Sequence, residues 1–346
     1  MKYKLVATTL FGLEDVLSHE LNELGAENIR KYRRAVRFEG STALIYKLNL
    51  SLRTALRILK QIKSFQVKEY DDLYDEVYKI PWQELFSYKH TFLINAVVNS
   101  KYFRHSHFVA QKVKDAIVDK FRDTKGIRPS VSTKDADIVI NVHISDRFTD
   151  VSMDSSGEPL FKRGYRKYQV EAPLNEVLAA GMILLTGWKG DSDFLDPMCG
   201  SGTLPIEAAL IAYNIPPGIF RKSFAFRNWM DFDEELLNRV VESSLKGRDF
   251  KYKIVGSDIS AEAIDAATKN AGQAMLEDRV EFKRCDFREL IPGSDRGLVV
   301  MNPPYDERLR SENIIRFYQS IGDRLKRNFA GYQAWILSGN KEAAKH

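Results

Sequence analysis

Residues 196–203 read Asp-Pro-Met-Cys-Gly-Ser-Gly-Thr, and this stretch decides the fold of the second half of the chain. The apolar run that ends at Asp196 is typical of a buried parallel strand, and the Ala-, Leu- and Ile-rich residues 204–212 favour a helix. A strand, a glycine-bearing turn and a helix form the nucleotide cradle of doubly wound sheets. Gly200 and Gly202 permit positive φ and a close approach of the backbone to a ligand.

The motif differs from the two common phosphate-binding loops. It lacks the third glycine of the dinucleotide fingerprint, and no Gly-Lys-Ser/Thr follows it. Asp196 instead places a carboxylate at the end of the strand, which suits a cationic ligand such as S-adenosylmethionine. A tight strand-to-helix turn without a ligand is the alternative interpretation.

A second motif lies about a hundred residues further along the chain. The apolar run 297–301 predicts a buried strand that leads directly into Asn302, Pro303, Pro304 and Tyr305. The two prolines remove two backbone donors and stiffen the loop. An amide before them can accept a hydrogen bond from an amino group, and a ring after them can stack on a flat base. The alternative is a proline-stiffened surface turn.

The two motifs together resemble those of class I methyltransferases that modify exocyclic amino groups of bases. Longer segments resemble the THUMP-domain family of 23S rRNA guanine-N2 methyltransferases, and these are residues 155–157, 163–166, 172–176 and 302–308. The resemblance implies an α/β fold, with a Rossmann-like class I methyltransferase domain behind N-terminal α+β ferredoxin-like and THUMP domains. One departure is Asp306, where the family usually has glycine.

The resemblance also implies roles for individual residues. The residues that it implies bind S-adenosyl-L-methionine are Asp196, Met198, Cys199, Gly200, Ser201, Gly202, Thr203, Asp258 and Asp286. Asp258 ends the next predicted strand, where an acidic residue accepts hydrogen bonds from ribose hydroxyls, and Asp286 is expected to contact the adenine amino group. Each could alternatively cap a helix. The catalytic loop is Asn302, Pro303, Pro304 and Tyr305.

Composition and length set broad bounds on the protein. The 346 residues suit two or three domains, and 44% hydrophobic with 29% charged residues is typical of a soluble globular chain. Cys199 and Cys285 alone give no metal spacing and no disulfide framework. Together with the lack of a signal peptide or membrane-length apolar run, this predicts a cytoplasmic protein. A net charge of +5 permits RNA binding without requiring it.

The expected organisation is an N-terminal ferredoxin-like domain over residues 1–64, a THUMP RNA-binding domain over 65–155, a linker over 156–172 and a methyltransferase domain over 173–346. Alternating strands and helices from residue 194 onward predict a parallel sheet with right-handed crossovers. A helix is expected over residues 173–188. Such sheets close with an antiparallel strand pair, and this pair is expected to be missing here.

Several basic segments are candidates for RNA contact. Lys101 and Arg104 lie in a loop that mixes cations, hydroxyls and aromatic rings. The linker carries a basic, aromatic cluster that consists of Arg163, Tyr165 and Arg166. We interpret this cluster either as a basic edge that steers the RNA backbone or as a charged tether. The arginine-rich residues 29–38 suit a solvated sheet edge and an RNA-facing stripe equally well.

Two further alternatives remain open at this point. The irregular, aromatic segment 213–231 suits a wall of a base pocket and a structural clasp about equally. The motif at Asn302 is also shared with DNA adenine-N6 methyltransferases, although the N-terminal half resembles an RNA-shape reader. A non-catalytic RNA-binding assembly factor is the third possibility, and the intact motifs argue against it.

Overall fold

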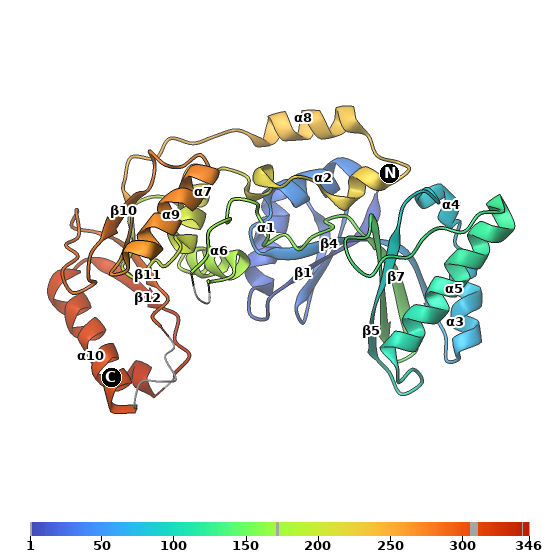
Figure 1. The fold of residues 1–346 in the computed structure, drawn as a ribbon, viewed down its shortest axis with the longest axis horizontal. Helices are drawn as coiled ribbons and strands as arrows, with labels where there is room; N and C mark the ends of the chain where they lie inside the picture. The colour runs from blue at the N-terminus through green and yellow to red at the C-terminus, as the bar shows by residue number, and fades with distance from the viewer. Residues whose placement is uncertain (1, 171–172, 305–310, 341, 346) are drawn as a thin grey trace. The chain divides into compact units, whose positions relative to one another are not determined.

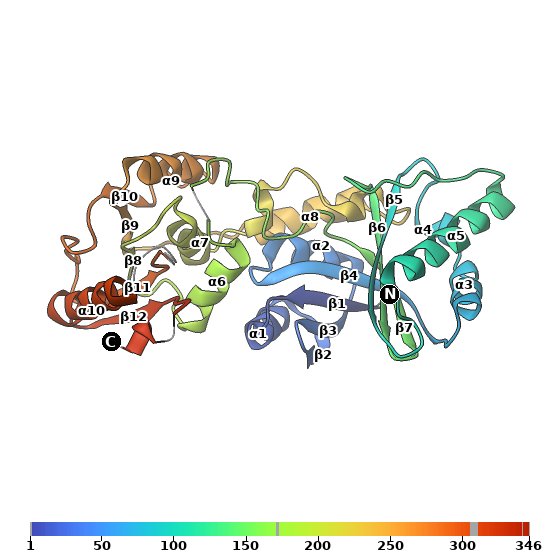
Figure 2. The ribbon, with the colours of Figure 1, turned by 60° about the horizontal axis from the view of Figure 1, so that its bottom comes forward.

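The computed structural model describes residues 2–170, 173–304, 311–340 and 342–345. The described chain forms two compact units (Figures 1 and 2). Unit 1 comprises residues 1–160 and 221–244, and unit 2 comprises residues 161–220 and 245–346.

Unit 1 is built on one seven-stranded sheet with the order β2-β3-β1-β4-β7-β6-β5. Its strands are β1 (Tyr3–Thr9), β2 (Glu27–Tyr32), β3 (Ala35–Gly40), β4 (Ala55–Gln66), β5 (Phe92–Asn99), β6 (Ile138–Ser145) and β7 (Phe148–Asp154). Its helices are α1 (Glu14–Leu24), α2 (Thr42–Ser51), α3 (Tyr70–Tyr78), α4 (Trp82–Leu85), α5 (Ser106–Lys125) and α8 (Glu234–Ser244). The expected boundary after residue 64 falls inside β4, which pairs with β1 on one side and β7 on the other.

Segment 221–244 contributes to the core of unit 1. Phe226 is fully buried and stacks on Tyr46 with ring centroids 4.4 Å apart, and Figure 1 shows α8 beside α2. The buried cation of Lys60 pairs with Asp231 at 2.7 Å and lies 5.0 Å from the ring of Trp229. The aromatic segment is therefore a structural clasp in this part of the molecule.

Unit 2 contains a five-stranded parallel sheet with the order β10-β9-β8-β11-β12. The strands are β8 (Asp193–Asp196), β9 (Ile254–Asp258), β10 (Glu281–Arg284), β11 (Gly297–Met301) and β12 (Tyr332–Ile336). The helices are α6 (Glu176–Leu185), α7 (Thr203–Ala212), α9 (Ala261–Gln273) and α10 (Ser311–Asn328), and short 3₁₀ turns lie at Pro217–Phe220 and Ala343–Lys345. A further 3₁₀ turn, Ala225–Asn228, belongs to unit 1. The parallel sheet with alternating helices confirms the expected fold class.

One expected helix begins later than the sequence suggests. The prediction placed Pro173 in the first turn, but α6 starts at Glu176. The Asn175 side chain accepts hydrogen bonds from the amides of Val177 and Leu178, so it caps the helix and sets its start.

Candidate active site

The two sequence motifs meet at one rim of the sheet in unit 2. β8 and β11 are parallel neighbours, with Phe194 opposite Leu298 and Leu195 opposite Val299. Their carboxyl ends therefore lie at the same edge of the sheet. The order of the strands along the chain reverses between β8 and β11. Ligands of open α/β sheets bind at such a switch point.

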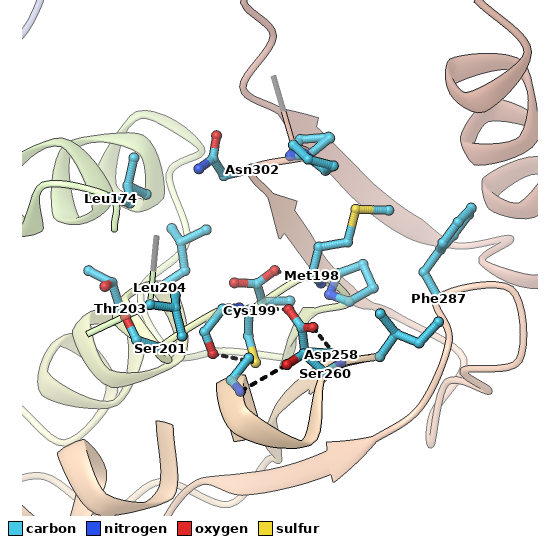
Figure 3. A pocket seen from close by; sticks show the side chains of 18 of the residues that line it. Leu174, Met198, Cys199, Ser201, Thr203, Leu204, Asp258, Ser260, Phe287 and Asn302 are labelled. Atoms are coloured by element: carbon cyan, nitrogen blue, oxygen red, sulfur yellow. Dashed lines mark hydrogen bonds between the residues drawn. The ribbon is translucent and has the colours of Figure 1, made fainter. Parts of the chain in front are cut away.

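A cavity of about 1000 Å³ lies at this rim (Figure 3). The sequence-predicted residues that line it are Asp196, Met198, Cys199, Gly200, Ser201, Thr203, Asp258, Asp286, Asn302, Pro303 and Pro304. Gly202 does not line the cavity. It directly precedes α7 with φ +83°, and a Cβ there would lie 2.9 Å from the Cβ of Ala267. Tyr305 lies outside the described residues, as do Asp306 and Arg308.

Hydrogen bonds fix the glycine loop against the neighbouring strand β9. The Cys199 amide donates to the carbonyl of Ser257 at 2.9 Å, and the Gly200 amide donates to Asp258 Oδ2 at 3.0 Å. Gly200 has φ +51°, a conformation that glycine adopts without a Cβ penalty. The loop backbone is consequently held open toward the cavity.

Asp196 is the most strongly perturbed acid of the site. Its side chain is 1% exposed, and its Oδ1 accepts a hydrogen bond from the Met198 amide at 3.1 Å. Burial raises the pKa of Asp196 from 3.8 to about 8, and the Asp258 carboxylate adds to the increase. No lysine or arginine of the described ranges pairs with this carboxylate, so a bound cation would stabilise its ionised form.

The next two acids along the rim already have partners. Asp258 Oδ1 accepts from the Ser260 amide at 2.9 Å, and each oxygen keeps a lone pair for a further donor. The Arg288 side chain forms a two-pronged ion pair with Asp286 and lowers the pKa of that carboxyl group. Asp286 can accept from an adenine amino group through its remaining lone pairs.

Apolar residues of the cavity were not predicted from the sequence. Val170, Leu174, Ile259, Phe287 and Phe317 line it beside the polar residues. Ile259 directly follows Asp258 at the end of β9, and Phe287 directly follows Asp286 after β10. Their position after an expected strand end was the available sequence signal. Val170 comes from the predicted linker and Leu174 from the start of the helix expected over residues 173–188, and neither position carried such a signal.

The linker cluster corrects the RNA prediction for Arg163 and Tyr165. Both side chains are only 1% exposed, and both contact the buried carboxylate of Glu207 on α7. Tyr165 donates its hydroxyl to Glu207 Oε1 at 2.9 Å. Buried groups cannot reach an RNA backbone, so the prediction that these two residues bind RNA is wrong.

Arg166 also forms hydrogen bonds with other residues of unit 2. Its guanidinium donates to the Leu174 carbonyl at 2.6 Å and to Glu176 Oε2 at 3.1 Å. These bonds fix the start of α6 and the cavity residue Leu174. Arg166 therefore positions the cavity wall, and its predicted RNA contact stays a prediction.

Lys101 and Arg104 are exposed in unit 1, in the loop between β5 and α5. The Ser100 hydroxyl donates to the Asp146 carbonyl at 2.5 Å, and the Asp146 amide donates to the Asn99 carbonyl at 2.8 Å. These bonds hold the loop beside the turn between β6 and β7. The predicted RNA contact of Lys101 and Arg104 stays a prediction.

Three family models match the chain in succession. Residues 4–59 match an RlmL ferredoxin-like domain, residues 67–154 match a THUMP domain, and residues 163–346 match an RMKL-like methyltransferase domain. The precise predicted domain limits stay a prediction.

Two curated relatives show high similarity over nearly the whole chain. A Synechocystis sp. protein named "Putative RNA methyltransferase slr0064" is 40% identical, over 98% of this chain and 89% of its own length. A "Ribosomal RNA large subunit methyltransferase K/L" of Syntrophotalea carbinolica is 38% identical, over 99% of this chain and 50% of its own length. The chain thus spans about half the length of the K/L relatives.

Two solved structures share the fold at 30% identity. The first, "SMU.472, a putative methyltransferase complexed with SAH", has a TM-score of 0.87 and covers 99% of this chain and 91% of its own. The second, from Listeria monocytogenes str. 4b F2365, is described as "a predicted N6-adenine-specific DNA methylase". It has a TM-score of 0.89 and covers 100% of this chain and 91% of its own.

Fold and site together define a class I methyltransferase whose cofactor is S-adenosyl-L-methionine. Within that class, the chain belongs to the RMKL-like methyltransferase family, preceded by a ferredoxin-like domain and a THUMP domain. Within the described residues, no group of histidine, cysteine and acidic side chains could hold a metal ion. No helix among them is long and apolar enough to cross a membrane.

Proposed function

We propose that this protein methylates the exocyclic N2 amino group of a guanine in 23S rRNA. The observation that carries the proposal is the shared cavity, which is lined by the glycine loop after β8 and by Asn302 after β11. A volume of about 1000 Å³ lies at the upper end of the range for small-molecule sites and leaves room for a base beside a cofactor.

The described residues fit S-adenosylmethionine, which supplies an activated methyl group when it is bound. The buried Asp196 carboxylate offers a negative charge to a cationic ligand, and Asp258 offers acceptors for ribose hydroxyls. Gly200 leaves the loop backbone accessible from the cavity. Met198 and Phe287 add apolar walls on which a flat ring can pack.

Asn302 would align the amino group of the target base. A guanine amino nitrogen is a poor nucleophile because its lone pair is delocalised into the ring. Asn302 Oδ1 and the Pro303 carbonyl can each accept one of its N–H groups, which localises the lone pair and orients it. Catalysis by such a site depends on positioning and electrostatic stabilisation. Stacking by Tyr305 remains part of the proposal, although this residue lies outside the described ranges.

The RNA substrate is supported by the N-terminal half of the chain and by the relatives. A THUMP domain precedes the methyltransferase domain, and the K/L relatives are named as enzymes of large-subunit ribosomal RNA. Exposed Lys101 and Arg104 would contact RNA phosphates from unit 1. We also propose a cytoplasmic location, which is where rRNA processing would bring the protein to its substrate.

A DNA adenine-N6 methyltransferase is the competing activity, and the Listeria structure carries that description. The match to a THUMP domain and the K/L relatives, which are named as enzymes of large-subunit ribosomal RNA, favour RNA over DNA. A non-catalytic assembly factor is disfavoured by the intact cavity. Nucleoside analysis separates the three, since they predict N2-methylguanosine, N6-methyladenine and no methylated product.

The test is methylation of rRNA from a strain lacking the gene, with tritiated cofactor and nucleoside analysis. We expect N2-methylguanosine with wild-type protein and a decrease of roughly 10²–10³-fold in Asn302→Ala, the size typical for removal of one well-placed polar group. Asn302→Asp keeps acceptor oxygens and serves as the matched variant with intermediate activity. Cofactor affinity measured by calorimetry should be unchanged in both. Equal labelling by Asn302→Ala and wild type would contradict the assigned role.

A further inference from the structure

Two exposed turns of unit 1 present an aromatic ring and an arginine side by side. Phe11, in the turn after β1, is 73% exposed. The Arg33 guanidinium, in the turn between β2 and β3, lies 5.6 Å from the centroid of that ring. An exposed phenylalanine adds nothing to the core of unit 1, so its position calls for another explanation.

The carboxylate of Glu14 ties these two turns together. Glu14 Oε2 accepts from the Gly12 amide at 2.8 Å, and Oε1 accepts from the Arg34 amide at 2.8 Å. The Thr9 amide donates to the Arg34 carbonyl at 2.9 Å, which adds a third bond between the turns. Phe11 and Arg33 are therefore held next to each other by the backbone, without relying on their own attraction.

A second ring and guanidinium lie on the same hairpin. Tyr32 is 47% exposed, and the Arg37 guanidinium lies 5.0 Å from its ring centroid. Arg37 is held from its other side by Asp150 at 2.6 Å. The hairpin thus carries two aromatic faces, each with an adjacent guanidinium.

The local charge balance leaves this surface positive. Lys31 pairs with Asp15, and Glu14 is occupied by backbone amides. Within the described residues, no carboxylate forms an ion pair with Arg33 or Arg34. Protection of the edge strand explains charges on β2 itself, which is the last strand of the sheet. It does not explain Phe11 and Arg33, which lie in turns.

We infer that Phe11 and Arg33 form a stacking site for an unpaired base of the RNA substrate. Aromatic rings and arginine planes bind splayed-out bases in this way, while neighbouring cations contact the backbone. Phe11 and Arg33 belong to unit 1, and the methyl-transfer cavity is lined by residues of unit 2. The inference rests on the proposed RNA substrate and names the part of it that unit 1 recognises.

The test uses full-length protein and a labelled single-stranded oligoadenylate of about 12 nucleotides, followed by fluorescence anisotropy. We expect Phe11→Ala to weaken binding roughly 5- to 150-fold, which is the range for one stacked base. Phe11→Tyr keeps an aromatic face and should bind like wild type. Tyr88→Ala is the matched control, since Tyr88 is 37% exposed beside Lys89 and is not part of the hairpin.

A 2-aminopurine base in the oligonucleotide gives a second readout. Its fluorescence should be quenched by wild type and by Tyr88→Ala, and remain high with Phe11→Ala. The inference would be overturned if Phe11→Ala bound the oligonucleotide and quenched its fluorescence like wild type. It would also be overturned if Tyr88→Ala lost as much binding affinity as Phe11→Ala. The rRNA methylation assay with wild-type protein tests the proposed function independently, so failure of one can be told from failure of the other.

Discussion

Replacing Asp196 by asparagine gives the most direct test of the site's electrostatics. Asp196 is 1% exposed, and burial raises its pKa from 3.8 in the unfolded chain to about 8 in the folded protein. A folded-state pKa above the unfolded value means that the native state binds the proton more tightly. The native state therefore loses stability as pH rises from 3.8 toward 8.

The size of this loss follows from the shift. Each pH unit between the two pKa values costs about 1.4 kcal/mol, and the curve flattens as pH approaches the folded-state value. Between pH 5 and pH 8 the carboxylate thus costs about 3–4 kcal/mol of folding free energy. Asparagine cannot ionise, and its oxygen can still accept the hydrogen bond from the Met198 amide. We expect Asp196→Asn to gain about this much over wild type on going from pH 5 to pH 8.

Hydrogen exchange of the β8 and β9 amides is the suitable assay, because it reports the opening free energy of unit 2 and not that of the whole chain. S-adenosylmethionine should protect these amides in wild type and lose most of this effect in Asp196→Asn, since the ligand's positive charge favours the ionised carboxylate. A stability difference between the two proteins that is the same at pH 5 and pH 8 would refute the raised pKa.

Three other experiments test the supporting structure. Arg163→Met alone leaves the buried Glu207 carboxylate without its partner guanidinium, and it should cost about 3–5 kcal/mol of unit 2 stability in urea unfolding. Adding Glu207→Leu should recover most of this loss. No loss of stability in the single variant would argue against a buried ion pair. Phe226→Ala removes a fully buried ring and should cost about 3–5 kcal/mol in unit 1 while exchange in β8 is unchanged. Gly202→Ala meets Ala267 at 2.9 Å with φ +83° and should lower both stability and cofactor affinity in calorimetry, whereas Gly272→Ala, with no atom within 4 Å, should lower neither.

The sequence was enough to expect the candidate site residues of unit 2 at one edge of the sheet, because the signals are local. Two strands of the parallel sheet end in an acid, Asp196 and Asp258, and a third is followed directly by Asn302. Parallel strands bring their carboxyl ends to one edge, so order along the chain was enough to place these residues together. The apolar lining from Val170 and Leu174 was missed because it depends on the path of the chain before α6.

The linker shows why charge alone was misleading. Arginine side chains are mostly exposed in proteins, and the cluster at Arg163 was therefore assigned to the surface. Its burial depends on Glu207, an acid in the otherwise apolar helix α7, 44 positions further along the chain. A lone carboxylate within an apolar helix was the only sequence signal, and no spacing rule connects it to Arg163.

The path of the chain has a consequence for the stability of each unit. Residues 221–244 leave the methyltransferase part of the sequence and complete the core of unit 1. They supply Phe226, and they also supply Asp231, the counter-charge of the nearly buried Lys60. A fragment ending near residue 160 would lose both and expose the apolar surface that they cover, while leaving a buried cation without its partner. The N-terminal half is a sequence match to two independent domains, yet its folded core requires a segment from the catalytic half.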